Sequence, residues 1–214
     1  TKPITSVAVM MLYEQGCLRL NAPVSEYIPE FADLRVYDPS DEAGVAPHRA
    51  MTVRDLLTHT SGLSYGWTDA AADKAYGAAE VRSGTLAEFA RKLGDIPLMH
   101  HPGATWEYSL STDVLGYLVQ VVSGVPFDEY LAREILGPLG MVDTAFHVTP
   151  DKLARFAANY GPDDDSDGLQ VIDDPRTGRY TQQPSRPSGG GGLVSTAGDY
   201  LRFSQMMLNG GELD

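Results

Sequence analysis

The amino-acid sequence predicts a mainly helical fold whose helices are joined by long loops. Apolar residues recur at helical spacing in several segments, and stretches rich in glycine and proline separate them. Only the segment 169–172 reads as a strand. The chain has 214 residues, of which 43% are hydrophobic, enough for one large domain or two small ones. We find no internal repeat and no clear linker.

The first helix is expected at the start of the chain. Apolar residues recur at helical spacing from Ile4 to Leu12, and Gly16 stands where a helix C-cap would lie. Pro3 is tolerated only in the first turn of a helix, so this helix begins at most about one turn upstream. Lys2 then lies at the N-terminus of the helix, where the macrodipole disfavours a cation.

The rest of the chain divides into expected helices and loops. We expect a short turn-rich piece at 24–29 and a loop at 34–50, followed by a helix at 53–59 that Thr52 caps. Further helices are expected at 85–93, at 114–122 before Gly124, at 127–136, and at about 196–208. The segment 161–188 reads as a loop that contains the strand at 169–172.

Composition excludes several classes of function. The net charge of −13 argues against binding to nucleic acid or to anionic membrane surfaces, since such a protein needs a basic face. No apolar run is long enough to span a bilayer. Cys17 is the only cysteine, so no internal disulfide is possible and the redox compartment stays open. We expect the cytoplasm in preference to the periplasm or secretion; the oligomeric state is not predicted.

Lys2 suggests a catalytic motif. A residue three positions before it would share its helix face, and its backbone N–H would be one of the unpaired donors of the first turn. A serine there would have a base beside it and an N–H able to stabilise an anion, which is what acyl transfer needs. The motif would be Ser-x-x-Lys. The 214 residues do not include that serine, and the alternative for Lys2 is a solvated lysine.

Larger stretches of the chain resemble a known family. The strings that carry the resemblance are, in chain order, TKPITSVAVMMLYEQGCLRLNAPVSEYIPEF, MTVRDLLTHTSGL, PGATWEYSLSTDVLG, ILGPLGMVDTAF and GGGGLVSTAGDYLRFSQMMLNGGEL. They are similar to consecutive blocks of the serine β-lactamase-like family, and most similar to the bacterial family VIII carboxylesterases, which are relatives of class C β-lactamases and DD-peptidases. The resemblance implies an α+β fold. The chain would be its helix-rich portion, one domain over residues 1–214 that is incomplete at both termini, with most of the antiparallel sheet outside it.

The resemblance implies two catalytic residues within the chain. Preceding residues would complete Ser-x-Thr1-Lys2, with Lys2 as the lysine that deprotonates the serine. That role needs a neutral amine, so we expect burial and a nearby cationic field to lower the pKa of Lys2. Tyr108 stands in the place of the family's second motif, Tyr-x-Asn, on a loop before a helix start that Ser109 and Ser111 could cap. It would share the proton and pass it to the leaving alkoxide. The alternative for Tyr108 is a tyrosine packed by Trp106.

Three further positions are implied as substrate-binding. Leu110 replaces the asparagine of the lactamases, which favours ester over lactam chemistry, and Gly190 and Gly191 fall where the family lines its pocket. A third motif is expected beyond Asp214. The implied function is a carboxylesterase that acts on short-chain esters through an acyl-serine, without a cofactor. The alternatives are a β-lactamase or D-amino-acid peptidase, and a catalytically silent member that binds ligands or partners.

Other candidate sites are less favoured. His59 could serve as a triad base, but we interpret it as a cation ending a short helix, and we expect no α/β-hydrolase elbow. His100-His101 has no evident third ligand, so no metal site is predicted. Asp163-x-Asp165-x-Asp167-Gly168 begins like a calcium loop, yet Gln170 and the break at Gly161-Pro162 favour a solvated acidic loop. The aromatic pair Tyr65 and Trp67 could line a substrate groove.

Overall fold

A computed structural model describes residues 1–68, 71–163 and 166–213. The chain divides into two compact units. The first unit comprises Thr1–Ile135 together with Arg186–Gly191. The second comprises Leu136–Ser185 and Gly192–Asp214. The expectation of one incomplete domain stays a prediction.

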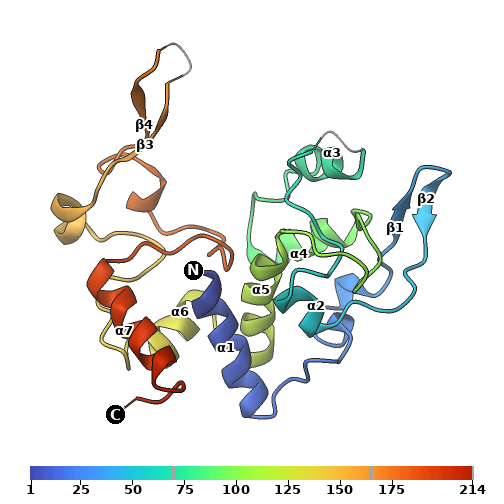
Figure 1. Ribbon diagram of the computed structural model, residues 1–214, viewed down its shortest axis with the longest axis horizontal. Helices are drawn as coiled ribbons and strands as arrows, with labels where there is room; N and C mark the ends of the chain where they lie inside the picture. Colours follow the sequence, from blue (N-terminus) through green and yellow to red (C-terminus); the bar gives the residue numbers. More distant parts are fainter. Residues whose placement is uncertain (69–70, 164–165, 214) are drawn as a thin grey trace. The chain divides into compact units, whose positions relative to one another are not determined.

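The first unit is a bundle of helices around α5 (Figure 1). Its helices are α1 (Lys2–Glu14), α2 (Val53–Leu57), α3 (Ala71–Ala78), α4 (Leu86–Gly94), α5 (Ser111–Ser123) and α6 (Phe127–Leu131). Helix α5 packs against α1, α2, α4 and α6, so most of its residues are buried. The helices expected from the start of the chain, after Thr52, from Thr85 and before Gly124 are confirmed.

Local signals in the sequence explain where these helices begin and end. Thr52 and Thr85 each form a capping box, in which the threonine hydroxyl and a carboxylate three residues later satisfy the first backbone N–H groups. Gly124 ends α5 in the left-handed conformation, with φ of 70°. Leu115, Leu118 and Phe127 are fully buried in the core. Each such side chain contributes roughly 1.5–3 kcal/mol by leaving water.

Parts of the first unit differ from the expected pattern. The expected loop at 34–50 contains an antiparallel hairpin of β1 (Val36–Asp38) and β2 (Asp41–Val45). Its register pairs Val36 with Val45. The turn-rich piece at 24–29 is confirmed as two short 3₁₀ turns, Val24–Glu26 and Pro29–Phe31. Beyond α6, the expected helix 127–136 continues as the π-helical turn Ala132–Leu136.

The second unit carries little regular structure. Strands β3 (Asn159–Pro162) and β4 (Leu169–Asp173) form an antiparallel hairpin, and α7 (Ala197–Leu208) is the expected last helix. Two 3₁₀ turns, Pro150–Arg155 and Arg179–Thr181, complete it. In the described residues both sheets are short and two-stranded, in agreement with the helix-rich portion of an α+β fold. None of the described helices is long and apolar enough to cross a membrane.

Candidate active site

Lys2 lies among groups that are distant in the sequence. As the first residue of α1 it is half-buried, and its Nζ donates a hydrogen bond to the carbonyl oxygen of Gly190 at 2.6 Å. The same nitrogen lies 4.7 Å from the ring centroid of Tyr108 and 5.7 Å from that of Tyr65. Lys2 and Tyr108 therefore lie next to each other, as two residues that share one proton must. Their catalytic roles stay predictions.

Tyr108 stands in the loop before α5 and belongs to a set of rings that we call the aromatic cluster. The cluster consists of His59, Tyr65, Trp67, Trp106 and Tyr108. Its ring centroids lie 5.1 Å from Tyr108 to His59 and 5.2 Å from Tyr108 to Tyr65. Trp67 stacks on Tyr65 at 4.4 Å, while Trp106 lies 6.3 Å from Tyr108. Tyr108 is 41% exposed and the two tryptophans 67% and 64%, so the cluster faces solvent.

Buried serines fix the loop that carries Tyr108. The hydroxyl of Ser109 lies 3.3 Å from His59 Nδ1 and 2.8 Å from the Ser111 hydroxyl, which in turn lies 2.7 Å from that of Ser61. The N-cap of α5 is Leu110, so Ser111 does not cap the helix, although Ser109 Oγ accepts from the Ser111 N–H at 3.4 Å. The network ties the start of α5 to the segment that follows α2.

His59 differs from the positively charged residue that was expected at the end of α2. It follows α2 with φ of 56°, a left-handed conformation that few residues other than glycine adopt. Burial, and then the positive charge of Lys2, lower its pKa. His59 is therefore neutral near pH 7, and the interpretation as a cation at a helix end is wrong. Its Nδ1 instead accepts from the Ser109 N–H at 3.3 Å.

The pKa of Lys2 is also shifted in the direction opposite to the expected one. Burial lowers it, but hydrogen bonding to the hydroxyls of Tyr108 and Tyr65 and their charge interactions raise it by more. The pKa therefore lies above its ordinary value, and Lys2 is an ammonium near neutral pH. For Tyr65, burial raises the pKa although Lys2 acts in the opposite direction. The prediction of a depressed lysine pKa is wrong in this arrangement.

The three residues proposed for substrate binding lie in different surroundings. The Leu110 side chain is buried in the core. Gly190 is buried, and its carbonyl binds Lys2. Gly191 is exposed, and its N–H donates to the Ser188 hydroxyl at 3.1 Å. Only Gly191 thus has a surface open to a ligand, and the substrate-binding roles of all three stay predictions.

Two residues near Lys2 were not singled out as catalytic candidates from the sequence. The rings show Tyr65 to be a second tyrosine beside the Lys2 amine. Asp113, in the first turn of α5, is 2% exposed and accepts hydrogen bonds from Arg186 and Ser188. The acidic residue after Tyr108 was visible in the sequence, but its partners lie more than seventy positions away.

One string, Gly62–Gly66, matches the Gly-x-Ser-x-Gly pattern of hydrolase elbows, although no elbow was expected. It does not form an elbow, because no described strand leads into it and no helix begins at Ser64. The Ser64 side chain is buried, and its hydroxyl accepts from the Gly66 N–H at 3.2 Å. Ser64 is therefore not an exposed nucleophile.

The histidine pair and the acidic loop do not form a metal site in the described part of the chain. No group of three or more His, Cys, Asp or Glu residues among residues 1–68, 71–163 and 166–213 could hold an ion. His101 stacks on His48 at 3.6 Å, and His100 lies 3.5 Å from Glu107. Asp165 of the calcium-like string lies outside the described residues, so the absence of calcium stays a prediction.

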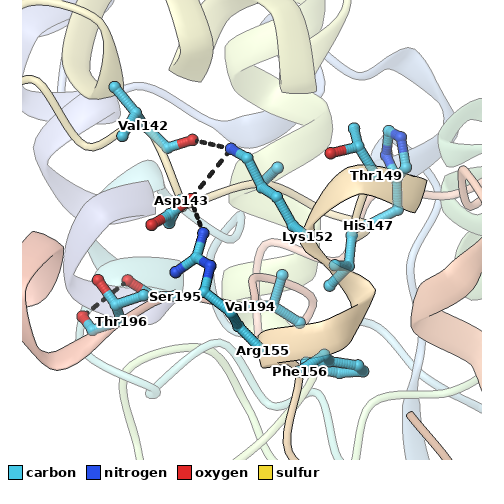
Figure 2. Close-up of a pocket in the computed structure, with 12 residues that line it drawn as sticks. Val142, Asp143, His147, Thr149, Lys152, Arg155, Phe156, Val194, Ser195 and Thr196 are labelled. Carbon is cyan, nitrogen blue, oxygen red and sulfur yellow. Dashed lines mark hydrogen bonds and ion pairs between the residues drawn. The ribbon is translucent and has the colours of Figure 1, made fainter. Parts of the chain in front are cut away.

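The second unit contains a small pocket of about 100 Å³ (Figure 2). Asp143 lies at its wall and pairs with Lys152 at 3.1 Å and with Arg155 at 2.8 Å. These two cations lower the pKa of Asp143 to about 2. Since the cations that line the pocket already bind a carboxylate, we interpret the pocket as a structural ion-pair cluster.

Comparisons with known proteins agree on one family. A family model described as Beta-lactamase matches residues 1–214. Protein Rv1367c of Mycobacterium tuberculosis is 38% identical over 100% of this chain and 53% of its own length. Esterase EstB of Burkholderia gladioli is 35% identical over 94% of this chain and 54% of its own.

A solved structure has a similar fold. That of EstCE1, described as a hydrolase with promiscuous acyltransferase activity, aligns with a TM-score of 0.83 at 28% identity. The alignment covers 99% of this chain and 57% of EstCE1. The chain therefore spans about half the length of the proteins that it matches.

Proposed function

Because the chain belongs to the β-lactamase family, we propose that the full-length protein is a serine hydrolase that cleaves carboxylic esters through an acyl-serine. Its nucleophile is a serine three positions before Lys2. The observation that carries the proposal is the position of the Lys2 amine, 4.7 Å from the Tyr108 ring and within hydrogen-bond distance of Gly190. Two groups that serve one serine oxygen must lie this close to each other.

The proposed reaction has two halves. The serine oxygen bonds to the ester carbonyl carbon while its proton passes to the Lys2–Tyr108 pair. The tetrahedral intermediate then collapses, the bond to the alkoxide breaks, and the same proton goes to the leaving alcohol. Water repeats the sequence on the acyl-serine, which releases the carboxylic acid and restores the serine.

The charge of Lys2 sets a condition on the proposed proton transfer. Because Lys2 is an ammonium at rest, the pair can accept the serine proton only after it has lost one proton of its own to solvent. Tyr108 is also partly exposed, so a bound ester has access to its side chain.

Ester chemistry is supported over lactam chemistry by the position of Leu110. It replaces the asparagine of Tyr-x-Asn and its side chain is buried, so it offers no amide to a β-lactam. Short-chain esters are the proposed substrates. The relative Esterase EstB supports ester cleavage by its name.

Acyl transfer to an alcohol is a second candidate function. The exposed rings of Trp67 and Trp106 flank Tyr108 and provide an apolar surface on which an acceptor could displace water. EstCE1 is described as a hydrolase that also has acyltransferase activity. An acceptor alcohol would then take the acyl group in place of water.

The test is turnover by the full-length protein of p-nitrophenyl acetate and butyrate, compared with a chromogenic cephalosporin. We expect ester cleavage in wild type and a drop in kcat of roughly a hundredfold or more in Lys2→Ala. Lys152→Ala is the matched control lysine that keeps activity. Faster cleavage of the lactam ring would favour the β-lactamase alternative. Absence of all turnover, with ligand binding retained, would favour the silent alternative.

A further inference from the structure

We propose that Asp113 is a positioning residue that, through Ser188 and Arg186, holds the Gly190 carbonyl against the Lys2 amine. The inference rests on the proposed function and names a residue that governs the geometry of its site. Asp113 is the third residue of α5 and is 2% exposed. It does not touch Lys2, so it acts through the chain segment between Arg186 and Gly190.

The carboxylate of Asp113 is the point where this segment is attached to α5. Its Oδ1 accepts a hydrogen bond from Ser188 Oγ at 2.6 Å and one from an Arg186 guanidinium nitrogen at 3.1 Å. The Arg186 side chain is 12% exposed, lies 5.0 Å over the Phe89 ring, and donates to the Arg82 carbonyl at 3.2 Å. Because both partners are buried, removal of one leaves the other without its charge partner and the attachment should fail.

The glycines of the segment allow its backbone to lie directly on the start of α5. A Cβ at Gly190 would lie 2.3 Å from Asp113 Oδ2, and a Cβ at Gly189 would lie 2.4 Å from the Thr112 carbonyl oxygen. Both distances are shorter than any side chain tolerates, so this close approach requires glycine. Gly191 has open space around it, which confines the requirement to the two residues that touch α5.

The first turn of α1 binds the other side of the same segment. Lys2 Nζ donates to the Gly190 carbonyl at 2.6 Å, and Thr5 Oγ1 donates to the Gly189 carbonyl at 2.8 Å. Donation to Gly190 uses one N–H of the amine and so fixes the direction of its remaining N–H groups. The amine is thereby held toward Tyr108 instead of rotating about its flexible stem. Asp113 thus determines the orientation of Lys2 from the far side of the segment.

A carboxylate in a helix's first turn also stabilises the helix, so loss of stability alone would not identify a positioning role. Asp199 provides a matched control in the second unit. It is likewise the third residue of its helix, is 3% exposed and pairs with an arginine, Arg202, at 3.0 Å. A general effect of an Asp→Asn change in a buried first turn should appear equally at both positions.

The experiment is a kinetic cycle in the full-length protein with p-nitrophenyl butyrate, using Asp113→Asn, Lys2→Ala, their double variant and Asp199→Asn. We expect Asp113→Asn to lower kcat roughly 10- to 100-fold with KM within about threefold, the scale that a small misplacement of a catalytic group produces. In the Lys2→Ala background the same change should have no further effect, since the group that it positions is absent. Asp199→Asn should change kcat less than about twofold.

Crystal structures of wild type and Asp113→Asn give a readout that does not depend on turnover. We expect the distance from Lys2 Nζ to the Gly190 oxygen to exceed about 3.5 Å in the variant, beyond hydrogen-bond length. An inactive wild type whose Lys2 contact is lost in Asp113→Asn would refute the proposed function but retain the positioning role. An active wild type with unchanged kcat in Asp113→Asn, equal losses in both Lys2 backgrounds, an equal loss in Asp199→Asn, or an intact Lys2 contact in the variant would overturn it.

Discussion

Helices α5 and α7 have the same residue type at the third position but use it for different purposes. Each has an aspartate as its third residue, buried and paired with an arginine. Asp199 binds its own surroundings: the Asp143 N–H at 2.8 Å and the Thr144 hydroxyl at 3.0 Å. Asp113 instead binds the glycine segment that contacts Lys2. The chemistry of a buried carboxylate does not reveal its role, which depends on what its partner touches.

The difference also appears in how the two helices are capped. Thr196 caps α7 by accepting a hydrogen bond from the Asp199 N–H at 3.1 Å, a local pattern that a sequence reveals. Helix α5 has Leu110 at its N-cap and no side-chain cap. The less regular start of α5 coincides with the loop that carries Tyr108, where we place the chemistry.

The largest expected effect on turnover comes from a substitution at Tyr108, in the proposed catalytic site near α5. In the full-length protein, Tyr108→Phe should lower kcat on p-nitrophenyl butyrate by roughly a hundredfold or more, because the ring packing remains while the proton relay is lost. Thermal stability should change little, since the Tyr108 side chain is partly exposed. Normal turnover in this variant would contradict the role of Tyr108 although the geometry would stand. Tyr200→Phe, a tyrosine of α7, is the matched control.

Two Gly→Ala substitutions test whether the close approach of the glycine segment to α5 matters for activity. Gly190→Ala places a Cβ against the Asp113 carboxylate, so the segment must shift and Lys2 must lose its partner. We expect a drop in kcat of about tenfold or more, because small displacements at a catalytic group are costly. Gly77→Ala, in α3, meets open space and should retain activity within about twofold. Equal activities of the two variants would show that the approach of Gly190 to α5 is not required.

Asp199→Asn tests the structural role proposed for the aspartate at the start of α7. The change leaves Arg202 without its charge partner and weakens the bonds to Asp143 and Thr144, so we expect a loss of about 1–3 kcal/mol in the free energy of unfolding. Urea denaturation followed by circular dichroism measures it. A variant as stable as wild type would mean that this carboxylate is not what holds the start of α7.

Acid sensitivity is the smallest expected effect and concerns the second unit. The pKa of Asp143 is lowered from 3.8 to about 2 by Arg155 and Lys152, so its ion pairs stabilise the folded state fully above pH ~4. This contribution is lost as the pH falls toward about 2, where the folded-state carboxylate becomes protonated. The stability of Asp143→Asn should therefore fall less steeply than that of wild type between these pH values. Parallel acid titrations of the two proteins would contradict this origin of acid sensitivity.

Elements with strong local signals could be predicted from the sequence. The capping residue Thr52 and the glycine at Gly124 marked helices that the structure contains. The hairpin at 36–45 was missed because its strands are short and one contains Gly44. Helix α3 contains Gly77 and was missed for a similar reason, the weakness of its helical signal. The strand at 169–172 was found, but its partner, ending at Pro162, reads as a loop until paired.

The site was predictable only in part, for a physical reason. Lys2 and Tyr108 were named from a motif and a resemblance, and the structure brings them together. The direction of the Lys2 pKa depends on two tyrosine hydroxyls and on burial, and none of these is visible in a sequence. The ion pair between Arg186 and Asp113 joins positions far apart in the chain, so no local sequence pattern predicts it.

The central claim is that Lys2 and Tyr108 serve a serine three positions before Lys2. It is tested most directly by locating the acyl group. Full-length protein is quenched in acid during turnover of p-nitrophenyl butyrate, digested, and mapped by mass spectrometry. The account predicts one butyryl group on the peptide that contains Lys2, attached to that serine, and its disappearance in Lys2→Ala. A butyryl group on another residue such as Ser64, or one that persists unchanged in Lys2→Ala, would contradict the account.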